Sequence, residues 1–370
     1  MDTPQDTSAA GPAGAPRGIG GGRPTIKDVA AAAEVSTATV SRVLSRSSNV
    51  SPELVARVTR VIDELGYSPN GLTRGVFRGR SNSIGVLVGD LRSHFYVELV
   101  RGAEEVATPA DSSVLLVGTS RNPSAERRLL NLMDEQRVRG LITTTGPDND
   151  DLTRQMASRG TQCVLLTRAP ATAHPGMHSV HLDDQAAGAL CARHLYRLGR
   201  RRIAVVTSTQ RLATQRLRLA GVTAERDATG PAAGAISAHV CDTGEPGDVA
   251  AAVAELLARR GGDGPPDAVI CTSGRLTREV VGSLRASGVR IPDDIALVSF
   301  DDFPWASLID PPLTVVDQQP YRMGVLATQL ILAEDRDEPE EVVIQPTLIV
   351  RRSCGASAPT ASPDIPYNGT

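Results

Sequence analysis

The chain has 370 residues, of which 41% are hydrophobic, 3% aromatic and 22% charged, and its formal net charge is −3. This composition is ordinary for a globular protein, and at roughly 100–200 residues per domain the length allows two or three domains. There is no apolar run long enough for a spanning helix and no secretory signal at the N-terminus. The five cysteines are scattered, which excludes a CxxC motif and fits a reducing cytoplasm.

The net charge hides an asymmetry along the chain. Residues 23–83 hold 9 Lys/Arg and 5 Asp/Glu, so the remainder must carry a net charge of −7. A basic N-terminal segment on an acidic body indicates an anion-binding module attached to a second domain, although an ordinary solvated surface also fits a surplus of this size.

Three short helices are expected between residues 25 and 67. Thr25 can cap the first, with Asp28 reaching back to it, and Ser36 can cap the second. The third starts at Pro52 and ends at Gly66. Their apolar faces are, in chain order, Ile26, Val29, Ala30 and Ala33; Val40, Val43 and Leu44; and Val55, Val58, Ile62 and Leu65.

From residue 83 the pattern changes to β-rich runs that alternate with helical stretches. The runs are 83–89, 114–118, 140–145, 162–167, 179–182, 201–207, 235–241, 267–272 and 294–300. This alternation predicts an α/β fold with parallel sheets covered on both faces, and about ten strands favour two lobes.

The first two helices have the pattern of a helix-turn-helix, because a short turn joins them and the second carries small polar and basic side chains. Ala38, Ser41, Arg42 and Ser45 are expected to point away from its apolar face. Such a helix fits a major groove, where an arginine can donate two hydrogen bonds to guanine. The alternative is a three-helix bundle with a solvated face.

Longer segments resemble the lactose/galactose repressor (LacI/GalR) family. TIKDVAAAAEVSTATVSRVLS (25–45) and VSPELVARVTRVIDELGYSPN (50–70) are similar to its DNA-binding headpiece. SIGVLVGDLRSHFYVELVRGAEE, RVRGLIT, HLYRLGRRRIAVV, QRLRLAG, PDAVICT, IPDDIALVSFDD and PPLTVV follow in the expected order. The resemblance implies a helix-turn-helix domain (25–69), a hinge (70–82) and a two-lobed Rossmann-like core of the periplasmic-binding-protein type I kind (83–352). Residues 1–24 and 353–370 are expected to be disordered tails.

The resemblance also implies a homodimer in which two recognition helices read an approximately palindromic operator. Thr37, Ala38 and Arg42 match positions that read bases. The full set of implied DNA contacts is Thr25, Ser36, Thr37, Ala38, Thr39, Ser41, Arg42, Ser45, Tyr67, Asn70 and Val76. Alternatively, Ser36 serves only as a helix cap and Tyr67 only as a packing residue.

The hinge departs from the family pattern. Val76 stands where the family inserts a leucine into the minor groove, and Gly71 and Gly75 each weaken a helix by about 1 kcal/mol relative to alanine. A plain flexible linker is the alternative.

Ligands of parallel sheets bind beyond the carboxyl ends of the strands, so residues just after strands are candidates for an effector site. The implied effector-binding residues are Tyr96, Thr167, Arg218, Ser273, Asp301, Trp305 and Gln318, with Asp90 and Phe95 nearby. Carboxylate, guanidinium and aromatic groups suit a sugar-like ligand. The alternatives are a turn-capping Asp301, a core Trp305, a core Phe95, and an Arg218 paired with a surface acid.

The pocket also departs from the family. Thr272-Ser273-Gly274 replaces the usual Ala-Asn-Asp, Thr167 replaces a frequent acid, and His94 replaces a small residue or proline. These changes weaken hydroxyl recognition and leave a sugar, a sugar phosphate, a nucleoside or another metabolite open.

The sequence therefore predicts a cytoplasmic, effector-controlled DNA-binding regulator, most simply a repressor, without cofactor, metal or membrane partner. A transport-type solute-binding protein is the alternative, although it needs a signal peptide and lacks a headpiece. An enzyme is disfavoured, because there is no GxGxxG after a strand, no P-loop, no GxSxG and no His/Cys cluster.

Overall fold

The computed structural model describes residues 24–44, 50–67, 81–144, 146–230, 233–234, 236–241, 247–258, 264–333 and 338–356. The chain divides into two compact units, Met1–Ser81 and Asn82–Thr370. Ser45, Asn70, Val76, most of the predicted hinge, and residues 1–23 and 357–370 of the predicted tails lie outside the described residues. Residues 353–356 were wrongly assigned to a disordered tail, because Ser353 and Cys354 are fully buried. Among the described residues, no helix is both long enough and apolar enough to cross a membrane.

The N-terminal unit contains the three expected helices, α1 (Ile26–Ala32), α2 (Thr37–Leu44) and α3 (Pro52–Leu65). Their predicted boundaries are confirmed. The Thr25 backbone N–H donates to Asp28 Oδ2 (2.7 Å), and the Thr39 N–H donates to Ser36 Oγ (3.1 Å). Gly66 ends α3 in the left-handed conformation (φ 60°), which glycine adopts without a steric penalty.

A small apolar core holds these helices together, and it corrects two expectations. Val29, Val40, Val58 and Val61 are among its buried members, and Tyr67 packs against them. Val55 is exposed, and Val61 takes the inward position instead. Ser41 was predicted to point outward, but it is 5% exposed. Two helices, α1 and α3, pack on α2, so the buried side of α2 includes Ser41 as well as its neighbour Val40.

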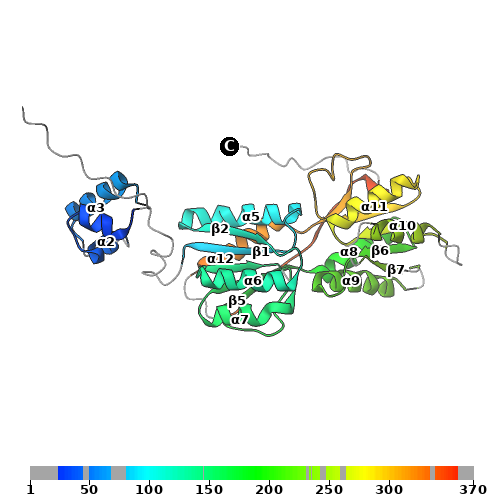
Figure 1. The fold of residues 1–370 in the computed structure, drawn as a ribbon. Helices are drawn as coiled ribbons and strands as arrows, with labels where there is room; N and C mark the ends of the chain where they lie inside the picture. Colours follow the sequence, from blue (N-terminus) through cyan, green and yellow to red (C-terminus); the bar gives the residue numbers. More distant parts are fainter. Residues whose placement is uncertain are drawn as a thin grey trace, which may run out of the picture. The chain divides into compact units, whose positions relative to one another are not determined.

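The C-terminal unit consists of two lobes, each built on one six-stranded sheet (Figure 1). Lobe 1 has the order β11-β5-β4-β3-β1-β2, and lobe 2 has the matching order β12-β10-β9-β8-β6-β7. The pairs are parallel except that β10 pairs antiparallel with β12. The strands of lobe 1 are β1 (Ser83–Val88), β2 (Ser113–Gly118), β3 (Gly140–Thr143), β4 (Gln162–Leu166), β5 (Met177–Leu182) and β11 (Glu341–Ile344). Those of lobe 2 are β6 (Ile203–Thr207), β7 (Ile236–Val240), β8 (Ala268–Cys271), β9 (Ala296–Phe300), β10 (Thr314–Asp317) and β12 (Thr347–Ile349). The predicted two-lobed α/β fold is confirmed.

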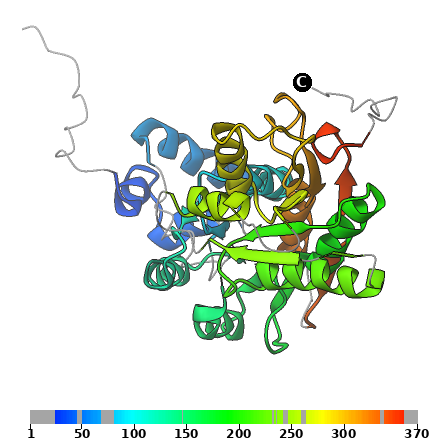
Figure 2. The same ribbon diagram turned by 90° about the vertical axis from the view of Figure 1, so that its right-hand side faces the viewer.

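Helices cover both faces of each sheet, as Figure 2 shows for lobe 2. Lobe 1 has α5 (His94–Ala107) packed on α12 (Pro320–Leu332), and α6 (Pro123–Glu135) packed on α7 (Asp150–Ser158). Lobe 2 has α8 (Asp184–Arg197) packed on α9 (Ala213–Thr229), and α10 (Asp248–Ala258) packed on α11 (Gly274–Ala286). Short 3-10 turns are η1 (Thr108–Ala110), η2 (Pro147–Asn149) and η4 (Arg352–Cys354). Strand residues alternate between two cores, with Val86 and Val88 in one and Leu87 in the other, as buried parallel strands require.

The chain passes between the lobes three times. It crosses after β5 into α8, after β10 into α12, and from β11 into β12. β11 and β12 were not predicted, since they are only four and three residues long and one of them runs antiparallel. Asp184 and Gln318 lie at two of these crossings, at the start of α8 and between β10 and α12.

Candidate functional site

The α2 helix presents a polar face to solvent. Thr37, Ala38 and Arg42 are exposed on it. Ser36 is also exposed, and its hydroxyl lies 2.9 Å from the hydroxyl of Thr39. Ser36 therefore does cap the helix, and the three exposed side chains form the part of α2 that can enter a groove.

Two predicted DNA contacts have buried side chains. Ser41 is enclosed by the helix packing described above, and Tyr67 is 7% exposed after the end of α3. Tyr67 thus packs in the headpiece core, as the alternative interpretation held. Thr25 is exposed, with its hydroxyl donating to Asp28 Oδ2 (2.7 Å).

A cleft of about 680 Å³ lies between the two lobes of the C-terminal unit. Lobe 1 contributes side chains that follow β1 and β2, and lobe 2 contributes the start of α11 and the loop after β9. The lining residues are Asp90, Arg92, Ser93, His94, Arg121, Gly247, Ser273, Gly274, Arg275, Arg278, Glu279, Asp301, Phe303 and Trp305. Three predicted effector residues, Ser273, Asp301 and Trp305, are therefore brought together, along with Asp90 and His94.

Asp301 accepts hydrogen bonds from two neighbouring segments of the lobe 2 wall of the cleft. It stands directly after β9 with φ 75°, and its Oδ2 accepts from the Gly274 N–H at 3.1 Å. Its Oδ1 accepts a short hydrogen bond from Gln318 Nε2. Burial raises the pKa of the Asp301 carboxyl, and the positive charge of Arg218 opposes that rise. Asp301 consequently joins the ends of β9 and β10 to the start of α11.

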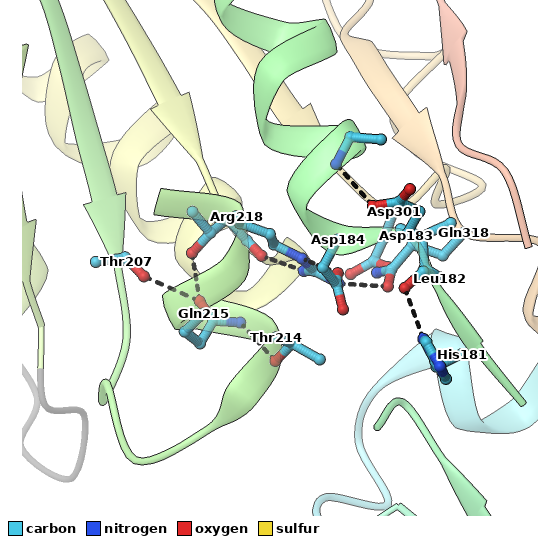
Figure 3. A network of polar contacts seen from close by, with 12 residues as sticks. His181, Leu182, Asp183, Asp184, Thr207, Thr214, Gln215, Arg218, Asp301 and Gln318 are labelled. Carbon is cyan, nitrogen blue, oxygen red and sulfur yellow. Dashed lines mark hydrogen bonds and ion pairs between the residues drawn. The ribbon is translucent and has the colours of Figure 1, made fainter. Parts of the chain in front are cut away.

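Arg218 lies behind the cleft wall, in a buried polar network (Figure 3). Its Nε donates to Asp184 Oδ1, its Nη1 to the Thr272 carbonyl and its Nη2 to Gln318 Oε1, each at 2.6 Å. The guanidinium also lies over the Phe300 ring, 4.1 Å from its centroid. Arg218 thus pairs with a buried acid, and Gln318 connects it to Asp301. Asp301 lines the cleft but Arg218 does not, and the alternative of a surface acid as the partner of Arg218 is wrong, because Asp184 is buried.

Tyr96 and Thr167 are not among the lining residues. Tyr96 packs edge-to-face on Phe95 (5.2 Å between centroids), and burial raises the pKa of its hydroxyl. The Thr167 N–H donates to the Val180 carbonyl, which ties this residue (φ 71°) to the end of the sheet. Phe95 is a core residue, as the alternative interpretation held.

Gly274 explains one departure from the expected Ala-Asn-Asp. A Cβ on this residue would lie 1.5 Å from Cζ of Phe303. The Phe303 ring in turn stacks on Trp305, with centroids 5.1 Å apart and planes 6° apart. The absence of a side chain at Gly274 therefore allows the aromatic pair to form one wall of the cleft.

Sequence reasoning missed the basic side of the cleft and the partner of Arg218. Arg121 follows β2 and Arg275 follows β8 within a few residues, so the rule of looking just after strands points to both. Asp184 also stands just after a strand, β5, but its pairing with Arg218 could not be predicted, because the two residues are 34 positions apart along the chain.

Comparison with known proteins agrees with this architecture. Residues 25–70 match the family model described as bacterial regulatory proteins, lacI family, and residues 192–354 match a periplasmic binding protein-like domain. The HTH-type transcriptional regulator KdgR of Bacillus subtilis is 27% identical over 90% of this chain and 98% of its own length. Catabolite control protein A of Priestia megaterium is 28% identical over 83% of this chain and 91% of its own.

Solved structures give the same result. A complex of the transcriptional regulator CelR with cellobiose is 29% identical, with a TM-score of 0.63 over 90% of this chain and 100% of that chain. The Lac repressor dimer bound to operator and the anti-inducer ONPF has the same coverage, a TM-score of 0.74 and 23% identity, which shows the shared fold. The chain therefore has a lacI-family helix-turn-helix domain followed by a periplasmic-binding-protein-like domain, and the relatives it resembles over most of its length include HTH-type transcriptional regulators and repressors.

Proposed function

We propose that the protein is an effector-controlled repressor, which binds DNA through α2 and a small molecule in the cleft between its lobes. The observation that carries the proposal is the combination of an exposed polar face on α2 with a polar cleft whose walls come from both lobes. A protein that works on DNA belongs in the cytoplasm. The proposal contains no catalytic step.

The DNA-binding surface is centred on Thr37, Ala38 and Arg42, which would reach base edges in a major groove. Thr25, Ser36, Thr39, Ser45 and Asn70 would contact phosphates, and Val76 would enter the minor groove. Ser41 and Tyr67 would act differently, because their burial supports a role in holding α2 in position rather than in touching DNA.

The proposed assembly is a homodimer. β2 is an edge strand of its sheet and exposes Leu115 and Leu116, and α5, which contacts β2, exposes Val97. An edge strand with exposed apolar side chains is suited to pairing with a second copy. Two headpieces would then read two half-sites related by an approximate dyad.

Arg42→Ala tests the DNA-reading role. DNA fragments retained by the full chain should share an approximately palindromic site, and the variant should lose about 1–3 kcal/mol of binding free energy for each half-site guanine contact. The measurement is a gel shift with this site and with random DNA, and Arg57→Ala on α3 is a suitable exposed control. An equal loss on both DNAs would make Arg42 a phosphate contact only.

The effector would act by preferring one arrangement of the lobes, which it can do because Asp301 and Gln318 connect the cleft wall to the crossings between lobes. The CelR structure holds cellobiose, which supports a small-molecule ligand here. The alternative, a solute-binding protein without a role on DNA, predicts no retained site in the DNA selection above.

A further inference from the structure

The cleft is rich in arginine. Arg92 and Arg121 come from lobe 1, and Arg275 and Arg278 come from the first two turns of α11 in lobe 2. They face three carboxyl groups, those of Asp90, Glu279 and Asp301. A site for a neutral polyol does not require four arginines. What the cleft can bind depends on which of these arginines are already paired with a carboxylate of the protein.

Part of this charge is already balanced. Arg92 donates to both carboxylate oxygens of Asp90, at 2.9 and 3.0 Å, and this lowers the pKa of Asp90. Asp301 is occupied by Gly274 and Gln318 as described above. Within the described part of the chain, neither Arg121 nor Arg278 has an ion-pair partner.

Arg275 differs from the other three arginines in having buried nitrogens without hydrogen-bond partners within the described ranges. Its Nη1 donates to Glu279 Oε1 at 3.1 Å, but its Nε and Nη2 are buried and have no hydrogen-bond partner among the described residues. Burial lowers the pKa of Arg275, and the positive charge of Arg121 on the other lobe lowers it further. A buried cationic N–H without an acceptor is destabilising, which makes two unpaired nitrogens at a cleft wall unusual.

The position of Arg275 and Arg278 at the start of α11 is also electrostatically unfavourable. The N-terminal end of a helix carries partial positive charge and favours acidic residues or anions. The first turn of α11 contains no acidic residue and does contain Arg275, and Arg278 follows three residues later. Local electrostatics that oppose folding are expected at functional sites, where a ligand supplies the missing charge.

We propose that the effector is an anion, a small carboxylated or phosphorylated metabolite, whose charged group binds Arg275 and Arg278 at the start of α11 and Arg121 on the facing lobe. Its carbon skeleton packs beside Trp305. This inference rests on the proposed function, because it names the class of the effector. Arg121 and Arg275 repel each other across the cleft, so the anion draws the lobes together by pairing with both.

The test uses the full chain and matched compounds that share a carbon skeleton: glucose, gluconate and glucose 6-phosphate, and ribose with ribose 5-phosphate. Emission of Trp305, the single tryptophan, is titrated at constant ionic strength with KCl as the salt control. At least one anionic member should change the emission in a saturable way, and its neutral parent should not. The gluconate and phosphate arms distinguish a carboxylate from a phosphate.

Arg275→Gln and Arg121→Gln should each raise the half-saturating concentration about tenfold or more, as expected for the loss of a charge-assisted hydrogen bond. Arg285→Gln is the control, because Arg285 lies on the same helix outside the cleft and donates to the Asp310 carbonyl. The inference is wrong if no anion acts beyond KCl, or if the neutral parents bind equally well and Arg275→Gln leaves them unchanged. An anion that binds without changing operator affinity would instead overturn the effector control while leaving the anion site in place.

Discussion

Arg218→Met is expected to destabilise the C-terminal unit by about 3–5 kcal/mol, the usual effect of removing one partner from a buried ion pair. Arg218 is 4% exposed and Asp184 is 3% exposed. The variant leaves the Asp184 carboxylate without its cation, and it also removes the donors to Thr272 and Gln318. Because Arg218 opposes the effect of burial, the pKa of Asp184 should rise further in the variant. Urea unfolding followed by Trp305 emission and far-UV circular dichroism measures the change.

A second ion pair between the same two helices supplies the control. Arg193 on α8 donates to Glu225 on α9 at 2.7 Å, but the Arg193 side chain is 48% exposed. Arg193→Met should therefore cost less than about 1 kcal/mol. Adding Asp184→Asn to Arg218→Met should restore part of the lost stability, since no unpaired charge then remains buried. Equal losses from Arg218→Met and Arg193→Met would contradict the role assigned to the buried network.

Gly221→Ala is expected to destabilise the same helix pair by about 1–3 kcal/mol or more, although alanine favours helix. Helices α8 and α9 cross at two glycines. A Cβ on Gly221 would lie 1.9 Å from the Gln185 carbonyl oxygen, and one on Gly188 would lie 2.0 Å from the Arg218 carbonyl oxygen. The obstacles are backbone atoms, so the helices must separate, and the Arg218–Asp184 hydrogen bond must lengthen with them.

Gly282→Ala is expected to have the opposite effect on the free energy of unfolding. Gly282 is an exposed position inside α11, and a Cβ there would meet nothing within 4 Å. Alanine should stabilise the protein at this site by roughly 0.5–1 kcal/mol, through helix propensity alone. Thermal unfolding of both variants compares them directly. If Gly221→Ala also stabilised the protein, the result would contradict the close approach of α8 and α9 at Gly221.

Much of the fold could be predicted from the sequence, because its signals are local. The caps at Thr25, Ser36 and Gly66 and the alternation of β-rich and helical runs each occupy a few neighbouring residues. The short strands β11 and β12 could not be found this way, since their partners β5 and β10 are supplied by distant parts of the chain. Ser41 and Val55 were misplaced because helical periodicity alone does not tell how far a neighbouring helix reaches around a face.

Part of the cleft between the lobes could also be predicted from the sequence. Positions just after strands led to Ser273, Asp301 and the Trp305 loop, all of which line the cleft. The burial of Arg218 depends on Asp184 and Gln318, and their contacts with it span 34 and 100 positions of sequence. Arg121 and Arg275 also follow strands, but they come from different lobes, and the sequence does not show that both line one cleft.

Linkage between the cleft and the operator tests whether effector binding controls DNA binding. Half-saturation of the effector is measured by Trp305 emission with and without operator DNA, and operator affinity is measured with and without saturating effector. Because coupling between two sites is reciprocal, both affinities should change by the same factor. An effector that fills the cleft while operator affinity stays unchanged would contradict control of DNA binding by the cleft.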